Sequence, residues 1–298
     1  MKLGRLYAIH APDFDLALTL DSGQVFHWEK SGAGFLAEIG GRAVYVEQHG
    51  DILKVREGKA PSPTGQRPVL PRVVARYFAL DHPLAAICAS LPNDRAMTAA
   101  KDYCRGLRII RQPRWECLAT FITSSMKQVA HIRQISRALR ERFGASKMIY
   151  GIHVYLFPGA RRLAEATERE LRDCALGYRA KNLLATARLI TGHQVDLEQL
   201  ALLPDDDLRD ALCQLPGVGP KVANCVMLFA YERLRAFPID VWIERVLREK
   251  YFPRRNVTSG QLRDFAAQHF GAHGGYAQQY LFHHARKTTP RRLSARGR

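Results

Sequence analysis

The sequence predicts an α+β fold, with an N-terminal antiparallel β-rich domain at residues 1–95 and a mostly helical, two-part body at residues 96–285. Short apolar–polar alternations next to glycines mark the first third of the chain, as half-buried strands do. From about residue 72 onward, apolar residues recur at helical spacing instead. Residues 286–298 are rich in arginine and poor in apolar residues, so we expect a disordered basic tail there.

The strands expected in the first domain follow from these alternations. Residues 14–20, Phe-Asp-Leu-Ala-Leu-Thr-Leu, alternate apolar and polar side chains and are predicted to form a strand. Residues 35–39 and 42–47 flank a Gly-Gly pair, which is typical of a tight hairpin turn, and residues 52–56 form a further strand. Residues 58–68 are rich in Gly, Pro and Ser and are expected to form a loop.

The helices expected in the body rest on apolar residues three or four positions apart. In the segment that begins at Arg114, this spacing places Leu118, Phe121 and Ile122 on one face. We expect helices over residues 114–123, 129–143, 160–175, 181–191, 205–214, 221–231, 241–251 and 258–270.

The charge balance indicates a polyanionic partner. The chain has 45 Lys and Arg against 28 Asp and Glu, a net charge of +17. Such an excess favours nucleic acid as the partner, although an organism with an arginine-rich proteome would give the same excess.

The sequence also indicates a cytoplasmic protein, nucleoid-associated if it is bacterial. Residues 1–10 lack the apolar segment of a secretion signal, and no run of 18 apolar residues is present to span a membrane. The six cysteines form no C-x-x-C pair, so we expect no zinc site, and free thiols suit a reducing compartment.

A glycine hairpin at a helix start gives the strongest indication of chemistry. Residues 215–223, Leu-Pro-Gly-Val-Gly-Pro-Lys-Val-Ala, place Gly217 and Gly219 where free N–H groups and the helix dipole favour a phosphate. Pro220 suits the first helical position, and Lys221 follows in the first turn. The dipole and burial both favour a neutral amine, which is a Schiff-base nucleophile. The simpler alternative is a surface lysine that touches a phosphate.

A second segment supports the catalytic interpretation. Residues 237–241, Phe-Pro-Ile-Asp-Val, place Asp240 directly before the helix expected over residues 241–251. An aspartate at that position is most simply an N-cap. Capping is compatible with a second role, in which the carboxylate stabilises a developing positive charge.

These two segments and four further motifs, in this order along the chain, resemble the 8-oxoguanine DNA glycosylases of the helix-hairpin-helix (HhH-GPD) superfamily, with the hairpin at residues 213–223. The further motifs are Ser22-Gly-Gln-Val-Phe-His-Trp, residues 106–125, Leu176-Gly-Tyr-Arg-Ala and Tyr276-Ala-Gln-Gln-Tyr-Leu-Phe. The resemblance implies a monomeric DNA repair enzyme without an organic cofactor that removes 8-oxoguanine from double-stranded DNA and nicks the strand. Members that also cut the strand carry a lysine at the position of Lys221.

The resemblance also implies a role for each site residue. Lys221 attacks the sugar and Asp240 stabilises its positive charge. The damaged base lies in a pocket formed by Gly23, Cys225, Gln278 and Phe282. The Gly23 carbonyl accepts the proton on ring nitrogen 7 that 8-oxoguanine has and guanine lacks. The opposite base and the vacated space in the duplex are contacted by Met126, His131, Tyr178 and Arg179.

The remaining implied contacts involve the backbone. DNA phosphates are bound by Gly217, Val218, Gly219 and Trp242. A monovalent cation is held by the main-chain carbonyls of Cys213, Leu215 and Val218. Simpler interpretations stay open for three side chains: core packing for Cys225, interface packing for Tyr178 and a phosphate contact for Arg179.

The chain departs from the family pattern at several positions. Met126 and His131 stand where relatives have an asparagine and an arginine that read the opposite cytosine, which leaves Arg179 as the reader. A methionine cannot hydrogen-bond a base edge, so we expect relaxed opposite-base preference. Trp242 replaces a frequent histidine. No cysteine follows Cys225, so the iron–sulfur cluster of some superfamily members is not possible.

Two other functions fit parts of the sequence. A monofunctional alkylpurine DNA glycosylase has the same hairpin, but attack by water needs no lysine at position 221. A non-enzymatic helix-hairpin-helix DNA-binding module accounts for the charge and the hairpin, but not for Asp240 or the lesion pocket.

Overall fold

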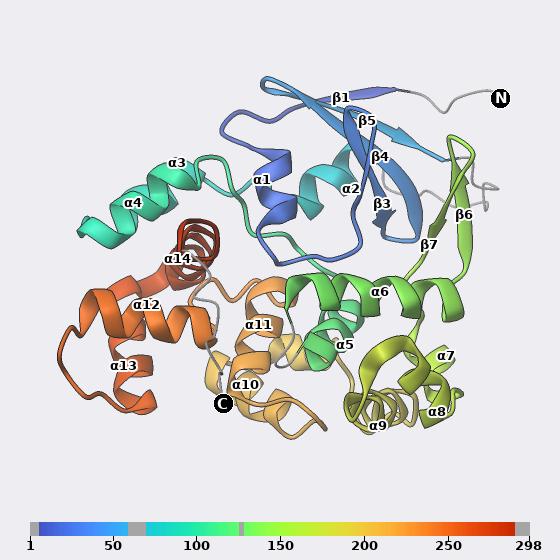
Figure 1. Cartoon of the computed structure of the whole chain (residues 1–298). Helices are drawn as coiled ribbons and strands as arrows, with labels where there is room; N and C mark the ends of the chain where they lie inside the picture. Colours follow the sequence, from blue (N-terminus) through green and yellow to red (C-terminus); the bar gives the residue numbers. More distant parts are fainter. Residues whose placement is uncertain (1–5, 59–69, 125–127, 290–298) are drawn as a thin grey trace, which may run out of the picture.

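The computed structural model describes residues 6–58, 70–124 and 128–289, and it has a β-rich domain beside a larger helical body (Figure 1). The main sheet is antiparallel, with strand order β1-β5-β4-β3-β2. Its strands are β1 (Tyr7–His10), β2 (Glu29–Ser31), β3 (Gly34–Ile39), β4 (Arg42–His49) and β5 (Ile52–Glu57). The three strands predicted after residue 34 are therefore confirmed as β3, β4 and β5.

The turn and the apolar face of the sheet explain its register. Gly40 and Gly41 have φ angles of +57° and +78°, which suit the two-residue hairpin turn expected between β3 and β4. Val46 of β4 pairs with Val55 of β5, and both side chains are fully buried. They belong to an apolar cluster that includes Val74 of helix α2 (Leu70–Tyr77), so α2 covers this face.

The strand predicted over residues 14–20 is wrong. The segment forms helix α1 (Leu16–Asp21), whose N-cap Asp15 accepts a hydrogen bond from the Leu18 backbone N–H at 2.8 Å. Leu16, Thr19 and Leu20 are buried on one side of this helix. The alternation of apolar residues was real, but an Asp cap with buried residues three and four apart selects a helix.

The helical body follows the predicted periodicity closely. The helices are α3 (Leu84–Ser90), α4 (Arg95–Tyr103), α5 (Arg114–Ser124), α6 (Val129–Phe143), α9 (Arg179–Thr191), η2 (Gln199–Leu202), α10 (Asp205–Cys213), α11 (Pro220–Ala230), α12 (Val241–Tyr251), α13 (Ser259–Phe270), η3 (Gly271–His273) and α14 (Gly274–Thr288). On α5, Leu118, Phe121 and Ile122 are all buried, as expected. The loop expected over residues 58–68 lies, apart from its first residue, outside the described residues.

The single helix predicted over residues 160–175 is wrong in its continuity. It is divided into α7 (Ala160–Ala164), α8 (Glu168–Leu171) and the π-helical segment η1 (Arg172–Leu176). Thr167 and Glu170 form a capping box that starts a new helix at α8. Ala175 and Gly177 then have φ angles of +63° and +58°, which end the helical run.

Several of the observed elements were not predicted individually. Strands β6 (Ser146–Ile149) and β7 (Ile152–Tyr155) form a hairpin whose Ile149 and Val154 pack against the main sheet. Helix α14 continues to Thr288, so residues 286–288, which were expected to lie in the basic tail, are helical. Residues 290–298 lie outside the described residues.

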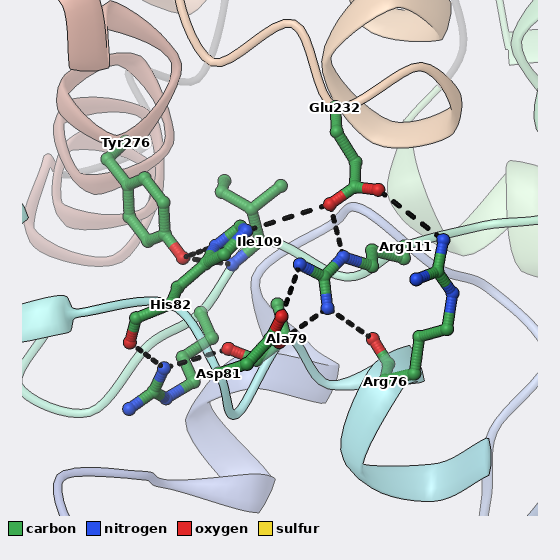
Figure 2. A network of polar contacts seen from close by, with 9 residues as sticks. Arg76, Ala79, Asp81, His82, Ile109, Arg111, Glu232 and Tyr276 are labelled. Atoms are coloured by element: carbon green, nitrogen blue, oxygen red, sulfur yellow. Dashed lines mark hydrogen bonds and ion pairs between the residues drawn. The ribbon is translucent and has the colours of Figure 1, made fainter. Parts of the chain in front are cut away.

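A polar network joins the first domain to the body (Figure 2). Nη1 and Nη2 of Arg111 lie 2.5 and 3.0 Å from the two carboxylate oxygens of Asp81, and Arg111 Nε donates to Glu232. His82 Nδ1 lies 2.9 Å from the hydroxyl of Tyr276 on α14. Because Glu232 follows the end of α11, this network fixes α11 and α14 relative to the first domain.

None of the helices in the described ranges is long and apolar enough to cross a membrane.

Candidate active site

The glycine hairpin lies between α10 and α11, as the sequence predicts. Gly217 has a φ angle of +81°, and a Cβ atom there would lie 2.8 Å from the side-chain nitrogen of Asn182 on α9. A glycine is therefore required both for the turn and for this close approach. Gly219 is the N-cap of α11 and Pro220 its first residue, which leaves the free N–H groups of the helix start exposed beside the exposed glycines.

Lys221 lies in the first turn of α11 and is half-buried. Its Nζ atom lies 5.2 Å from the centroid of the Phe121 ring on α5, and it pairs with no carboxylate of the described residues. The aromatic ring restricts the position of the Lys221 side chain. Because no carboxylate binds the amine, the amine remains available as a nucleophile.

Asp240 caps the next helix through one of its two carboxylate oxygens. Its Oδ1 accepts hydrogen bonds from the backbone N–H groups of Trp242 and Ile243, at 3.1 and 2.9 Å. Burial raises the pKa of the Asp240 carboxyl, although the bond from Ile243 and the charge of Lys221 act in the opposite direction. Because the charge of Lys221 lowers the pKa of Asp240, the two predicted catalytic residues lie within electrostatic reach of each other.

Of the expected base-pocket residues, Gly23 and Phe282 lie close together, and Cys225 lies one helical turn after Lys221. Gly23 has a φ angle of +87°, and a Cβ atom there would lie only 3.1 Å from the Phe282 ring on α14. Cys225 is buried one turn after Lys221, and burial raises the pKa of its thiol, partly opposed by the charge and hydrogen bond of Lys221. Cys225 is therefore a neutral thiol, suited to packing against a base.

Gln278 adds a buried polar group to this pocket. Its side chain is only 5% exposed, and its Oε1 atom has no hydrogen-bond partner within the described residues. A buried amide oxygen without a partner is costly unless a ligand or water completes it. Gln278 therefore carries an unpartnered acceptor in a buried position, where a polar ligand would complete it.

The backbone around Gly23 shows a pattern that sequence reasoning missed. The neighbouring carbonyls accept bonds from side chains of the body: Asp21 from Arg286, Ser22 from Gln279 at 2.8 Å, and Gln24 from Gln112 at 2.7 Å. No donor among the described residues reaches the Gly23 carbonyl, which is the one left open in this run. Nothing in the sequence indicates these long-range bonds, and it predicts that Arg286 belongs to the basic tail.

The residues expected at the opposite base lie in different settings. Tyr178 is 60% exposed after the left-handed residues Ala175 and Gly177, so it projects from the surface. The guanidinium of Arg179 is buried and lies 4.3 Å from the Tyr178 ring centroid. His131 is exposed on the first turn of α6, and Met126 lies outside the described residues.

Trp242 begins α12 beside Asp240 and is half-buried. The guanidinium of Arg245 lies 5.8 Å from its ring centroid, and the neighbouring Val241 is 78% exposed. This helix start therefore presents a cation and an aromatic ring beside the hairpin, which fits a contact to a phosphate.

The hairpin carbonyls fit the donor type of a monovalent cation. The Leu215 carbonyl accepts one hydrogen bond, from Val218 N at 3.0 Å, which leaves a lone pair. No described residue donates to the carbonyls of Cys213 or Val218. By contrast, the described ranges contain no group of three or more His, Cys, Asp or Glu that could hold a metal ion.

Comparison with known proteins gives two family matches. The N-terminal domain model of 8-oxoguanine DNA glycosylase matches residues 6–118, and the model of HhH-GPD superfamily base excision DNA repair proteins matches residues 119–269.

Individual relatives agree over nearly the whole chain. A probable N-glycosylase/DNA lyase of Methanothermobacter thermautotrophicus is 29% identical over 93% of this chain and 95% of its own. An N-glycosylase/DNA lyase of Saccharomyces cerevisiae is 30% identical over 94% of this chain and 85% of its own. The Clostridium acetobutylicum 8-oxoguanine glycosylase/lyase, bound to double-stranded DNA with cytosine opposite 8-oxoguanine, has a TM-score of 0.85 and 28% identity, covering 96% and 99% of the two chains.

Proposed function

The chain belongs to the HhH-GPD superfamily of base excision DNA repair proteins, in its 8-oxoguanine DNA glycosylase branch, and from this premise we propose that it excises 8-oxoguanine from duplex DNA and cleaves the abasic strand through Lys221. One observation carries the proposal. Among the described residues, a half-buried lysine that pairs with no carboxylate and a half-buried aspartate lie at the starts of two helices, close enough for the lysine charge to lower the pKa of the aspartate, and the lysine follows a glycine hairpin. A binding module does not require this arrangement, and attack by water does not require the lysine.

The chemistry assigns one step to each group. The neutral amine of Lys221 forms a bond to the anomeric carbon of the sugar as the bond from that carbon to the base breaks. The electron pair of the broken bond leaves with the base, which then takes up a proton. Asp240 stabilises the positive charge that develops on the sugar through its carboxylate, which is held in place as the cap of α12.

Strand cleavage follows from the same covalent bond. The sugar ring opens to a Schiff base on Lys221, and loss of a proton from the adjacent sugar carbon expels the 3′ phosphate. The exposed hairpin N–H groups near Gly217 and Gly219 and the start of α12 at Trp242 bind the neighbouring phosphates, supported by the net positive charge.

The open carbonyl of Gly23 supports the choice of lesion. The flipped base enters the pocket between Phe282 and Cys225, and its ring nitrogen 7 lies toward this carbonyl. 8-Oxoguanine has a proton on that nitrogen and completes the bond, whereas guanine presents a second lone pair to the carbonyl oxygen. Gln278 bonds the pairing edge with its unpartnered Oε1.

We also propose finer properties of this reaction. The enzyme acts as a monomer with relaxed preference for the opposite base, since Met126 and His131 replace polar readers and Arg179 remains. The carbonyls of Cys213, Leu215 and Val218 hold a structural monovalent cation that stabilises the hairpin and takes no part in the bond changes.

The test is trapping with sodium borohydride, which reduces a Schiff base to a permanent protein–DNA bond. Duplexes carry 8-oxoguanine opposite each of the four bases, with an undamaged guanine duplex as the control. We expect a covalent product for all four lesion duplexes, in similar amounts, and none for guanine. A strong cytosine preference overturns the relaxed pairing alone. Absence of trapping, with release of an alkylated base from a methylated duplex, establishes the monofunctional alternative.

A further inference from the structure

Two side chains of α14 hold the backbone on which the lesion contact depends. Residues 21–24 connect α1 to the rest of the first domain, and the open carbonyl of Gly23 lies between occupied ones. Because Gly23 adopts a left-handed φ angle of +87° and has no side chain, its own residue does little to fix the carbonyl direction. The direction depends on what holds the residues before and after it.

Arg286 is placed to hold this backbone from one side. Its Nη2 donates to the Asp21 carbonyl, and its guanidinium lies 5.6 Å from the Phe282 ring centroid. Its Nη1 would lie 3.6 Å from a Cβ atom on Gly23. Arg286 therefore contacts Asp21, two positions before Gly23, and also lies beside the ring of Phe282.

The setting of Arg286 is largely buried, with 15% of the side chain exposed, and it is electrostatically costly. Burial lowers the pKa of its guanidinium, opposed by the charge of Asp21. Its Nε atom has no hydrogen-bond partner among the described residues. A charged group is retained in such a setting only where its remaining bonds compensate, and the bond to a charged donor is the strong kind.

Gln279 holds the next residue from the same helix. Its Nε2 donates to the Ser22 carbonyl at 2.8 Å, and the side chain is 3% exposed. It directly follows Gln278, whose side chain we place against the base edge. Two consecutive glutamines thus have separate tasks, one toward the ligand and one toward the backbone that faces the ligand.

We propose that Arg286 and Gln279 are positioning residues for lesion recognition, which hold the Asp21–Ser22 backbone so that the Gly23 carbonyl meets ring nitrogen 7 of the bound base. This inference rests on the proposed function and deepens it. The specificity of the pocket is set from α14 through the backbone, and not by pocket-lining groups alone.

The consequence is a separation of two activities. Recognition of the base needs the Gly23 carbonyl, whereas cleavage at an abasic site does not, because no base remains. Loss of Arg286 or Gln279 therefore impairs excision of 8-oxoguanine and leaves lyase activity on preformed abasic DNA intact. A residue that only stabilises the fold lowers both activities together.

The experiment measures single-turnover excision of 8-oxoguanine and cleavage of a preformed abasic duplex for Arg286→Ala, Arg286→Lys and Gln279→Met. We expect Arg286→Ala and Gln279→Met each to lower excision about tenfold, as for loss of one buried hydrogen bond to the recognition backbone. Abasic cleavage stays at the wild-type rate. Arg286→Lys retains a charged donor and regains part of the excision.

Lys287→Ala is the matched control. Lys287 Nζ pairs with the Asp21 carboxylate at 2.5 Å, but it is exposed and bonds the side chain, not the backbone. We expect wild-type values for both activities. If Arg286→Ala does not fold, Gln279→Met decides the question.

Each outcome has one meaning. Unchanged excision in Arg286→Ala or Gln279→Met, or an equal loss of excision and abasic cleavage, overturns the positioning role. Failure of the wild-type protein to excise 8-oxoguanine overturns the proposed function instead.

Discussion

The part of the site that we propose acts on the sugar and the part that we propose holds the base are built in different ways. Lys221 and Asp240 each start a helix, and each is fixed by its own helix and the hairpin beside it. Gly23 and Phe282 come from the first domain and from α14, and they meet only because α14 packs against the end of α1. The sugar site is local in sequence, whereas the base site depends on docking between distant segments.

Substitutions in the two parts of the site should therefore impair different activities. A change that disturbs the contact between α14 and α1 should impair base recognition while the sugar chemistry persists. A change at either helix start should impair both activities, because base removal and strand cleavage use the same nucleophile.

Lys221→Gln is expected to have the largest effect. It removes the amine while retaining length and polarity, so excision of 8-oxoguanine should fall at least about a thousandfold and abasic cleavage should disappear. Rates of both reactions and the melting temperature of the variant check this. Substantial cleavage by the variant at a normal melting temperature would assign the nucleophile to another residue.

Asp240→Asn tests the second residue of the proposed sugar site. Asparagine caps helices as well as aspartate does, so the bonds to Trp242 and Ile243 and the free energy of unfolding should be retained. Without the negative charge, excision should fall about a hundredfold. Because burial raises the pKa of Asp240, wild-type excision should also decline with acidification at a higher pH than for an ordinary aspartate. If the excision rate falls only as far as the lower free energy of unfolding explains, Asp240 acts solely as the N-cap of α12.

Gly23→Ala addresses the base side. The new Cβ atom meets the Phe282 ring at 3.1 Å in a left-handed conformation, which costs about 1–2 kcal/mol in strain. We expect excision of 8-oxoguanine to fall about tenfold or more, because the shifted backbone turns the carbonyl away. Excision rates at saturating enzyme check this, and a wild-type rate would show that this carbonyl has no role.

A second contact between the first domain and the helical body should make stability depend on pH. Glu116 of α5 pairs with Arg140 of α6 and lies 3.4 Å from His27 of the first domain. Burial raises the pKa of Glu116 to about 7, with Arg140 opposing the shift.

The sign of the pH effect follows from this pKa. Between about pH 4.5 and about pH 7, the folded protein retains a proton on Glu116 that the unfolded chain has lost. This group's contribution to stability therefore falls as pH rises through that window. Burial lowers the pKa of His27, so the contribution of His27 to stability rises with pH. This contribution is present in wild type and in Glu116→Gln, so it cancels when the two are compared.

The measurement is the free energy of unfolding of Glu116→Gln and wild type across this window. The difference should move in favour of Glu116→Gln as pH rises, by up to about 1.4 kcal/mol per pH unit. At each pH, the ratio of excision to abasic cleavage should be the same for Glu116→Gln and wild type. A difference that does not depend on pH would mean that Glu116 is ionised throughout.

The sequence predicted the sugar site because its signals are local. Glycines, a proline and a lysine around position 220, and an aspartate before a helix, each carry their own conformational meaning. The boundaries of α6 at residues 129 and 143 were predicted for the same reason. The base pocket was placed only through the resemblance.

What the sequence could not supply depends on tertiary contacts. Residues 14–20 fit a strand by alternation, and only the Asp15 cap and the packing beneath it make α1 a helix. Arg286 looked like part of a charged tail, since nothing nearby in sequence reports its bond to Asp21. Both errors fall where α1 meets α14, and this is the junction that builds the base site.

Borohydride trapping of Gly23→Ala and Lys221→Gln on a duplex with a preformed abasic site tests most directly whether the sugar site works without the base site. We predict that Gly23→Ala is trapped to the wild-type level and that Lys221→Gln is not trapped at all. Loss of trapping in Gly23→Ala, in parallel with its loss of excision, would contradict the account and make the two parts of the site one unit.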